Sequence, residues 1–503
     1  MMTTPAHTQE FPLRIGSPED FARVGSSLRD AGFDEMTVCR TLKIAEMSDV
    51  GSIKAEEADF GGISERLALF IKLFLFLRLM PRAEVERLLD RATLDSFLTL
   101  GILRIGEYGA DQYYTPVLLY PVAGFLIVSD RHSNPDRSEF VPPPDVVFPA
   151  IYAGTLRFLR LISKSPAEDV LDLGAGTGIG AFVLSRHARR AVASDLTERA
   201  THFARFNRLL NKLENVEVVC GDLYGSVEGR SFDRIIAHPP YVPALKSAAI
   251  WRDGGETGEV LVRRIIEGLP RHLRPGGTLY MVCMGLDTSE AKFEERARSW
   301  LKDSQSEFDV IFALGEERSP QEVIRAVAEK YQNLEPADAA RLEQAFDRAD
   351  AVKLSYGALA MHRRARGGEP WTTRTRLSDE TEGSDLEWAL DWHRRCERPG
   401  FQEELLQARP QLAPHLEVKV THVVHEGSLV PADFVFETNK PFTAATRFDP
   451  WMVPLITRFD GASTPLELYE AARAASEIPE AYGLKDFTAL VIFLIERGYL
   501  LLR

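Results

Sequence analysis

The stretch that decides the fold is VLDLGAGTGIG, residues 170–180. A strand-like apolar run ends at Asp172, and three glycines follow it in a GxGxG arrangement before a helical segment begins: Gly174, Gly176 and Gly178. Glycine allows a tight turn and a close approach of the backbone to a ligand because it has no Cβ. A dinucleotide site requires GxGxxG and a helix N-terminus aimed at pyrophosphate. Here an acidic residue opens the loop, which favours a ligand with a cationic amino-acid end.

Two more acids end the next two strand-like runs. Asp195 closes AVASD, where a carboxylate can accept hydrogen bonds from both ribose hydroxyls. Asp222, followed by Leu223, closes VEVVCGDL and is expected within reach of an adenine amino group. Taken alone, Asp195 fits a helix cap and Asp222 a turn residue better than a ligand-binding role. Because the carboxyl ends of neighbouring parallel strands meet in one crevice, the acids and the glycine loop together predict a cofactor site.

Short Val/Ile/Leu runs alternate with helical segments through the middle of the chain. This alternation predicts an α/β, Rossmann-like domain over 140–365 with a parallel sheet covered on both faces. Two later runs, FDVIFAL (308–314) and VKLSYGALAMHRR (352–364), complete an expected total of seven strands, and the charged segment near 317–350 is expected to be a helical insertion.

The segments on either side predict mainly helical, winged-helix-like domains. In the N-terminal domain (1–139), a buried helix at 67–80 and an amphipathic helix pair precede two apolar runs, QYYTPVLLYP and GFLIVSD, expected to form a hairpin. A polar linker (366–385) leads to a C-terminal domain (386–503) that ends in two helices and a short strand. No row of basic residues marks a recognition helix, so packing or formation of a homodimer is favoured over DNA binding.

The composition narrows the partners and the compartment. The 503 residues carry 74 acidic and 60 basic side chains, a net charge of -14, which disfavours a broad nucleic-acid surface. The four cysteines are far apart and show no zinc-ligand spacing, so no metal is expected. The N-terminal residues lack a secretion pattern, and the apolar 67–80 run is too short and too charged to span a membrane. We expect a cytoplasmic protein.

A candidate transfer site follows the fourth strand-like run, FDRIIA. It consists of His238, Pro239, Pro240 and Tyr241. Two successive prolines fix φ and carry no N–H, so this backbone is stiff and its carbonyls are free to accept hydrogen bonds. The alternative is that His238 only closes the strand and that Tyr241 belongs to the core.

These residues resemble class I S-adenosylmethionine-dependent methyltransferases. Asp172 and the three glycines match the family's first motif, Asp195 its ribose acid and Asp222 its adenine-side acid. FARFNRLLN (203–211), HPPYVP (238–243), RDGGETGEVLVRRIIEGLPRHLRPGG (252–277) and VFPA (147–150) are similar to the catalytic half of the release-factor glutamine methyltransferases. The resemblance covers about 140–365 and implies S-adenosylmethionine as cofactor.

The same resemblance implies roles in transfer. In amino-methyltransferases the residue at position 238 and the carbonyl at 239 accept from a planar NH2 group, on which the aromatic residue at 241 stacks. Here His238 stands where release-factor enzymes have Asn, which puts a glutamine-amide acceptor in doubt. A neutral imidazole accepts through one nitrogen, and a histidine with a near-neutral pKa can also take a proton.

Three hypotheses remain open. The preferred one is methyl transfer to a nitrogen of a protein, peptide or small molecule. The second keeps the chemistry but makes an RNA or DNA base amine the acceptor. The third is a scaffold that binds the cofactor without transferring the methyl group.

Overall fold

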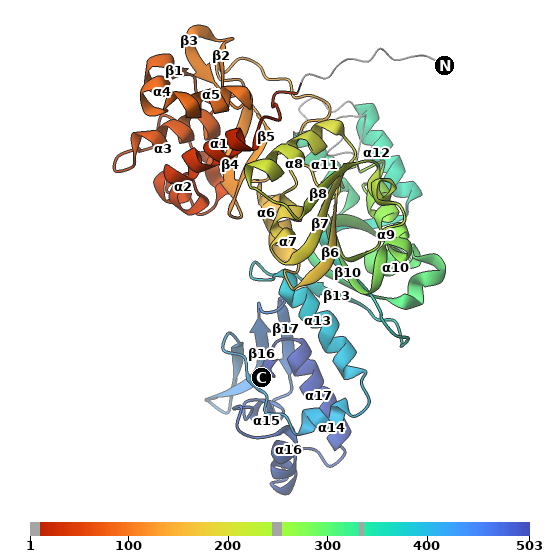
Figure 1. The fold of residues 1–503 in the computed structure, drawn as a ribbon. Coiled ribbons are helices and arrows are strands. Elements are labelled where there is room, and N and C mark those ends of the chain that lie inside the picture. The colour runs from red at the N-terminus through yellow and green to blue at the C-terminus, as the bar shows by residue number, and fades with distance from the viewer. Residues whose placement is uncertain (1–10, 244–253, 331–335, 503) are drawn as a thin grey trace.

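A mixed sheet of eight strands forms the centre of the computed structural model, which describes residues 11–243, 254–330 and 336–502 (Figure 1). The strands in spatial order are β13 (Thr372–Arg376), β11 (Phe308–Arg318), β12 (Ala351–Arg363), β10 (Leu273–Thr288), β9 (Phe232–Ala237), β6 (Ala167–Leu173), β7 (Ala188–Asp195) and β8 (Val216–Cys220). The strands from β10 to β8 run parallel, with Val170 opposite Ala191 and Arg234. Only β12 runs against its neighbours β10 and β11. All the parallel strands therefore end at one edge.

The expectation of seven strands is wrong by one. The eighth strand, β13, lies inside the 366–385 stretch that the sequence presents as a linker, and it pairs in parallel with β11. Its sequence, TTRTR, has no apolar pattern, and its residues are partly exposed; Arg374, with 14% of its side chain exposed, is held by charge pairing instead. That guanidinium donates to Asp287 at 2.7 Å and to Glu294 at 2.9 Å.

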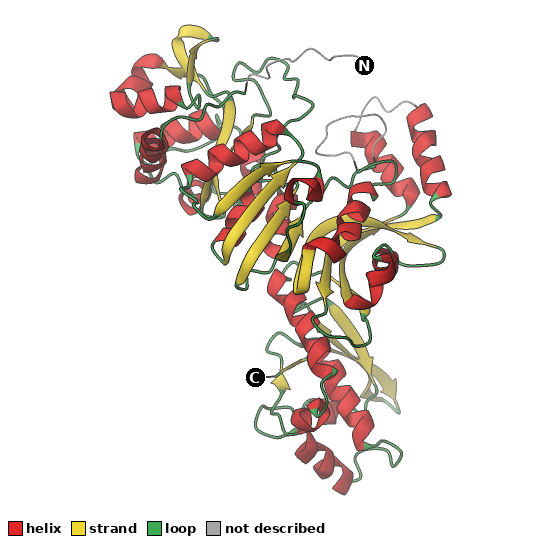
Figure 2. Ribbon diagram, turned by 45° about the vertical axis from the view of Figure 1, so that its right-hand side comes forward, coloured by secondary structure: helices red, strands yellow, loops and turns green. Residues whose placement is uncertain are grey.

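Helices cover both faces of the sheet (Figure 2). One face packs against α6 (Ala153–Leu161), α7 (Ile179–Ser185) and α8 (Glu198–Leu210), and the other against α9 (Val260–His272) and α10 (Phe293–Ser299). Successive residues of β6 enter opposite cores, Val170 the first and Leu171 the second. A sheet buried on both faces requires the continuous apolar runs that the sequence contains.

The expected helical insertion between β11 and β12 consists of α11 (Pro320–Lys330) and α12 (Pro336–Arg348). Val323 and Phe346 from these helices pack on Leu286 of β10 and Leu354 of β12. Two short 3-10 turns complete this domain, η3 (Leu223–Val227) and η4 (Lys302–Glu307).

The N-terminal part is mainly helical and carries a small three-stranded sheet, β1-β3-β2. Its elements are α1 (Pro18–Asp30), α2 (Glu35–Leu42), η1 (Met47–Ser52), α3 (Glu65–Phe70), η2 (Ile71–Leu75), β1 (Met80–Pro81), α4 (Arg82–Leu88), α5 (Arg91–Thr99), β2 (Arg104–Gly106) and β3 (Gly109–Tyr114). The apolar run expected as a buried helix over 67–80 is helical only to Leu75, as α3 with η2, and Met80 belongs to β1. Leu67, Phe70 and Phe74 lie in the core.

The expected hairpin is divided differently. The run QYYTPVLLYP splits between β3 and β4 (Val117–Val122), and β4 pairs with β5 (Phe125–Asp130) in a separate two-stranded sheet. Every residue of β4 and β5 is buried. Asn207 of α8 pairs with the backbone of Val128, and Asn211 with that of Leu126, through both amide groups at 2.7–2.9 Å. The side-chain amides of α8 thus occupy the free edge of β5 and join the N-terminal part to the central domain.

The C-terminal part contains more strand than the expected helical domain. Its elements are α13 (Gly383–Cys396), α14 (Phe401–Leu406), β14 (Gln411–Leu412), β15 (Glu417–His425), β16 (Ser428–Thr438), β17 (Ala444–Phe448), α15 (Val453–Ile456), α16 (Pro465–Ala474), α17 (Leu484–Glu496) and β18 (Leu500–Leu501). The final helix pair and short strand are present as expected, but β15, β16 and β17 form an additional antiparallel sheet. The Val and Phe alternation on either side of Glu426-Gly427 signals this hairpin in the sequence.

The expected domain limits at 139, 365 and 385 stay predictions. Residues 1–10 and 331–335, and Arg252 with Asp253 of the family-like segment, lie outside the described residues. No described helix combines the length and the hydrophobicity that crossing a bilayer requires.

Candidate active site

The glycine loop after β6 has the backbone that the sequence predicts. Gly174, Gly176 and Gly178 have φ values of 72°, 54° and 88°, in the left-handed region that favours glycine. A Cβ added at Gly174 or Gly176 would meet nothing within 4 Å, so these two face open space. A Cβ at Gly178 would lie 2.7 Å from Phe182, which makes this third glycine a packing requirement at the start of α7.

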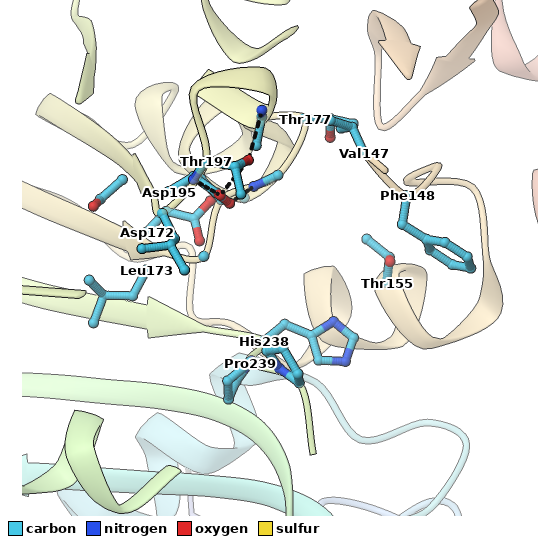
Figure 3. Close-up of a pocket in the computed structure, with 18 of the residues that line it drawn as sticks. Val147, Phe148, Thr155, Asp172, Leu173, Thr177, Asp195, Thr197, His238 and Pro239 are labelled. Atoms are coloured by element: carbon cyan, nitrogen blue, oxygen red, sulfur yellow. Dashed lines mark hydrogen bonds between the residues drawn. The ribbon is translucent and has the colours of Figure 1, made fainter. Parts of the chain in front are cut away.

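Two carboxyl groups lie beside this loop, the buried Asp172 and the partly buried Asp195 (Figure 3). Asp195 accepts from the Gly176 N–H at 2.9 Å and from the Thr197 N–H at 3.1 Å, and thereby holds the loop in place. Asp172 accepts from the Ala181 N–H at 2.9 Å. Burial raises the pKa of Asp172 to about 7, and it also raises the pKa of Asp195. Both sites therefore disfavour an ionised carboxylate without a cation or further donors nearby.

The third acid has a different environment. The Asp222 carboxylate pairs with Arg264 of α9 at 2.7 Å, and 54% of its side chain is exposed. Leu223 follows with a φ of 48°, which turns the chain sharply into η3. Both residues border the same cavity as the glycine loop, with Asp222 already held by a basic partner.

His238, Pro239, Pro240 and Tyr241 follow β9 and border the opposite side of the cavity, as Figure 3 shows for His238 and Pro239. The His238 ring stacks on Phe158 of α6 with centroids 5.2 Å apart, and it lies 5.9 Å from the Tyr241 ring. Burial lowers the pKa of His238 to about 4. The imidazole is neutral at pH 7 and is a weaker base than the near-neutral histidine considered from the sequence.

One cavity of about 540 Å³ connects these groups, a size typical of small-molecule sites. It brings together every site residue predicted from the sequence except Gly178, which lies behind the loop. Further lining residues are not singled out by the sequence. Val147, Phe148 and Thr177 lie in the quoted VFPA and glycine-loop segments, and Tyr152, Thr155, Phe158 and Thr197 come from segments without a functional pattern. Groups of three or more potential metal ligands do not occur among the described residues.

The wall formed by the loop before α6 depends on the N-terminal part. Asp130, the last residue of β5, accepts from the Val147 N–H at 2.8 Å and donates its own N–H to the Val147 carbonyl at 3.1 Å. Its carboxylate also accepts from Arg199 of α8 at 2.8 Å, and both of these side chains are buried. Phe148, which follows Val147 in the chain, stacks on Tyr152 with ring centroids 4.4 Å apart. The hairpin thus positions one side of the cavity.

Comparison with known families gives this arrangement a context. Residues 149–302 match the family model described as methyltransferase small domain. Over this segment the chain is similar to methyltransferases, in agreement with the resemblance seen in the sequence. The cofactor that this family implies is S-adenosylmethionine, and the eight-stranded sheet with its helices is the corresponding methyltransferase fold.

Curated relatives align with the methyltransferase domain. A ribosomal protein uL3 glutamine methyltransferase of Bradyrhizobium diazoefficiens is 33% identical over 159 residues, 29% of this chain and 50% of that protein. A release factor glutamine methyltransferase of Koribacter versatilis is 31% identical over 160 residues, 28% of this chain and 56% of that protein. A ribosomal RNA small subunit methyltransferase C of Mannheimia succiniciproducens is 34% identical over 131 residues, 26% of this chain and 36% of that protein. The chain spans about half the length of the first two.

Proposed function

We propose that the chain transfers a methyl group from S-adenosylmethionine to a nitrogen atom of a protein, peptide or small molecule. The observation that carries this proposal is the shared cavity, in which the glycine loop and Asp195 face His238 and Pro239 (Figure 3). One side of the cavity can hold a nucleoside with a cationic end, and the other can orient an acceptor. The similarity to two glutamine methyltransferases supports the choice of nitrogen.

The cavity fits the proposed cofactor on its own geometry. Gly174 and Gly176 leave open the space that side chains would fill. Asp195 accepts from two backbone N–H groups and, at 3.4 Å, from the Thr197 hydroxyl; since a carboxylate has about four acceptor positions, it retains capacity for a ribose hydroxyl. Asp172 would hold the cationic amino-acid end, and Asp222 with Leu223 would border the adenine. When bound, S-adenosylmethionine supplies a methyl group that is already activated on a sulfonium centre.

The His238–Tyr241 segment would act by orienting the acceptor. The neutral His238 ring can accept an N–H through one nitrogen, and the Pro239 carbonyl can accept a second. Pro240 keeps the backbone stiff, and the Tyr241 ring offers a face for stacking. Holding the acceptor nitrogen in line with the methyl group makes the displacement effectively unimolecular.

A base amine of RNA is the second candidate acceptor, supported by the similarity to a ribosomal RNA methyltransferase. The net charge of -14 opposes it.

We also propose that residues 64–114 form a winged-helix unit, supported by the order helix, β1, α4, α5, β2 and β3. Arg91 and Asp95 on α5 have opposite charges 3.8 Å apart, so this unit is proposed as a packing module. The four free cysteines support a cytoplasmic location.

The test combines the purified chain, isotopically labelled S-adenosylmethionine and fractionated cell extract. Mass spectrometry should find a protein, peptide or metabolite that gains one labelled methyl group with the wild type and not with His238→Ala. Label in RNA alone would replace the acceptor class with the second candidate. Tight cofactor binding without labelling of any fraction would favour the scaffold hypothesis over the enzyme.

A further inference from the structure

The β15–β16 hairpin exposes aliphatic side chains on both of its faces. Val423 pairs across the strands with Val430, and Val424 pairs with Leu429. These four side chains are 39–74% exposed, and Val418 and Val420 further along β15 are each 41% exposed. Aliphatic residues concentrated on one protruding element indicate an interaction surface rather than ordinary surface scatter.

The outer edge of β15 is also free. Within the residues that the structure describes, β15 pairs with β16 alone and forms the edge of the sheet β15-β16-β17. All nine of its residues are exposed. Natural edge strands are usually protected by proline, bulges or a covering element, because unpaired N–H and C=O groups recruit another strand. This strand contains no proline, and its one lysine, Lys419, is paired with Glu437. The register of the β15–β16 pair shifts between Thr421 and His422, but the extra residue, Ala432, lies in β16 and not in the edge strand.

We propose that β15 pairs antiparallel with β15 of a second copy of this chain and forms a two-fold dimer with a continuous six-stranded sheet. The strand sequence, EVKVTHVVH, matches itself in only one register that uses all nine residues, the one centred on Thr421. In this register Glu417 lies opposite His425 of the second copy, and Val418 lies opposite Val424. Lys419 faces Val423 rather than a second lysine, so no like charges meet.

The dimer leaves the methyltransferase cavity accessible. The C-terminal part joins the central domain beside the start of β6, where Glu387 of α13 accepts from Ser163 and Ser165 at 2.6 and 2.7 Å. The cavity lies at the opposite, carboxyl ends of the strands. In Figure 1, β16 lies in the lower part of the molecule, below β6 and α7. The interface therefore does not compete with the proposed acceptor.

The small size of the proposed β15–β15 interface determines the protein concentrations at which a dimer should be sought. Nine residues of β15 from each copy are fewer than the roughly 20–30 residues a side of a standard interface. We therefore expect reversible dimerisation, visible by sedimentation velocity of the full chain at micromolar concentrations. A wild type that is monomeric up to about 100 µM, ten- to a hundredfold above such a range, would overturn the proposal and leave the hairpin to a different partner.

Charge changes at the two-fold axis test the register itself. Thr421→Arg and Thr421→Glu each place like charges opposite their own copy and should weaken self-association by about tenfold or more. An equimolar mixture of the two variants should restore the dimer as a mixed pair. Val352→Arg, at a half-exposed valine of β12, is the matched control and should dimerise like the wild type. Unchanged dimerisation of Thr421→Arg, or no dimer in the mixture, would overturn the proposed pairing.

Discussion

Replacement of Asp195 by alanine tests the cofactor side of the cavity. Its carboxylate holds two backbone N–H groups, those of Gly176 and Thr197, and is proposed to accept from the ribose with its remaining capacity. A hydrogen bond to a charged group contributes about 1.5–3 kcal/mol, part of which water returns to the truncated site. We expect a net loss of about 1–3 kcal/mol in binding, which corresponds to a dissociation constant raised about 5- to 150-fold.

The assay must separate binding from folding, because Asp195 also supports the loop. Asp169 is the matched control: it lies at the other end of the same sheet and pairs with Arg190 and Arg274 at 2.6 and 2.7 Å. Both alanine variants should lower the free energy of unfolding in urea, but only Asp195→Ala should weaken S-adenosylmethionine binding in isothermal titration calorimetry. Affinity within twofold of the wild type in a folded Asp195→Ala protein would refute the ribose assignment.

Three more predictions follow from the same structure. Burial holds the pKa of Asp172 at about 7, above the ordinary 3.8, so the ligand-free protein should lose stability as pH rises from about 4 to 7. The affinity for the cationic cofactor should instead rise from about pH 6 to 8. Binding titrations at several pH values should show this rise, and Asp172→Asn should remove it. His238→Ala should lower kcat by at least about tenfold and leave cofactor affinity unchanged, and equal losses in kcat and in affinity would indicate a structural role. Since the wild-type histidine has a pKa of about 4, the kcat of the wild type should show no histidine titration between pH 6 and 8. Arg199→Ala leaves the buried Asp130 without its cationic partner and should lower the free energy of unfolding in urea by about 3–5 kcal/mol. Arg91→Ala, at an exposed pair, should lower it by less than about 1 kcal/mol. Similar losses in the two variants would contradict the proposed role of the buried pair.

The sequence predicts the cofactor side of the cavity because local chemistry encodes it. A glycine loop and an acid at a strand end are short-range patterns, and parallel strands bring their carboxyl ends together in any such sheet. The approach of Asp195 to the Gly176 N–H follows from these patterns. The pairing of Asp222 with Arg264, 42 residues away in the chain, depends on how α9 packs and has no local pattern.

Another part of the cavity wall and the strand β13 could not be predicted from the sequence, because they too depend on contacts between distant segments. The wall at Val147 and Phe148 depends on the N-terminal hairpin, because Asp130 of β5 holds the Val147 N–H, and periodicity does not encode that contact. The strand β13 has no apolar pattern in the sequence because its side chains are only partly buried, and Arg374 is held by ion pairs with Asp287 and Glu294. Both the missed wall and the missed strand depend on partners from distant segments.

The insertion of Asn207 and Asn211 into the edge of β5 limits how this molecule can be dissected. Excising the catalytic segment at about residue 139 would strip the amides of their backbone partners and leave Arg199 facing water without Asp130. The severed hairpin, whose residues are all buried in the intact chain and are mostly apolar, would in turn be exposed. A fusion of the catalytic segment to another protein should therefore retain residues 1–139 as well. A fragment without them is expected to aggregate rather than to be an active enzyme.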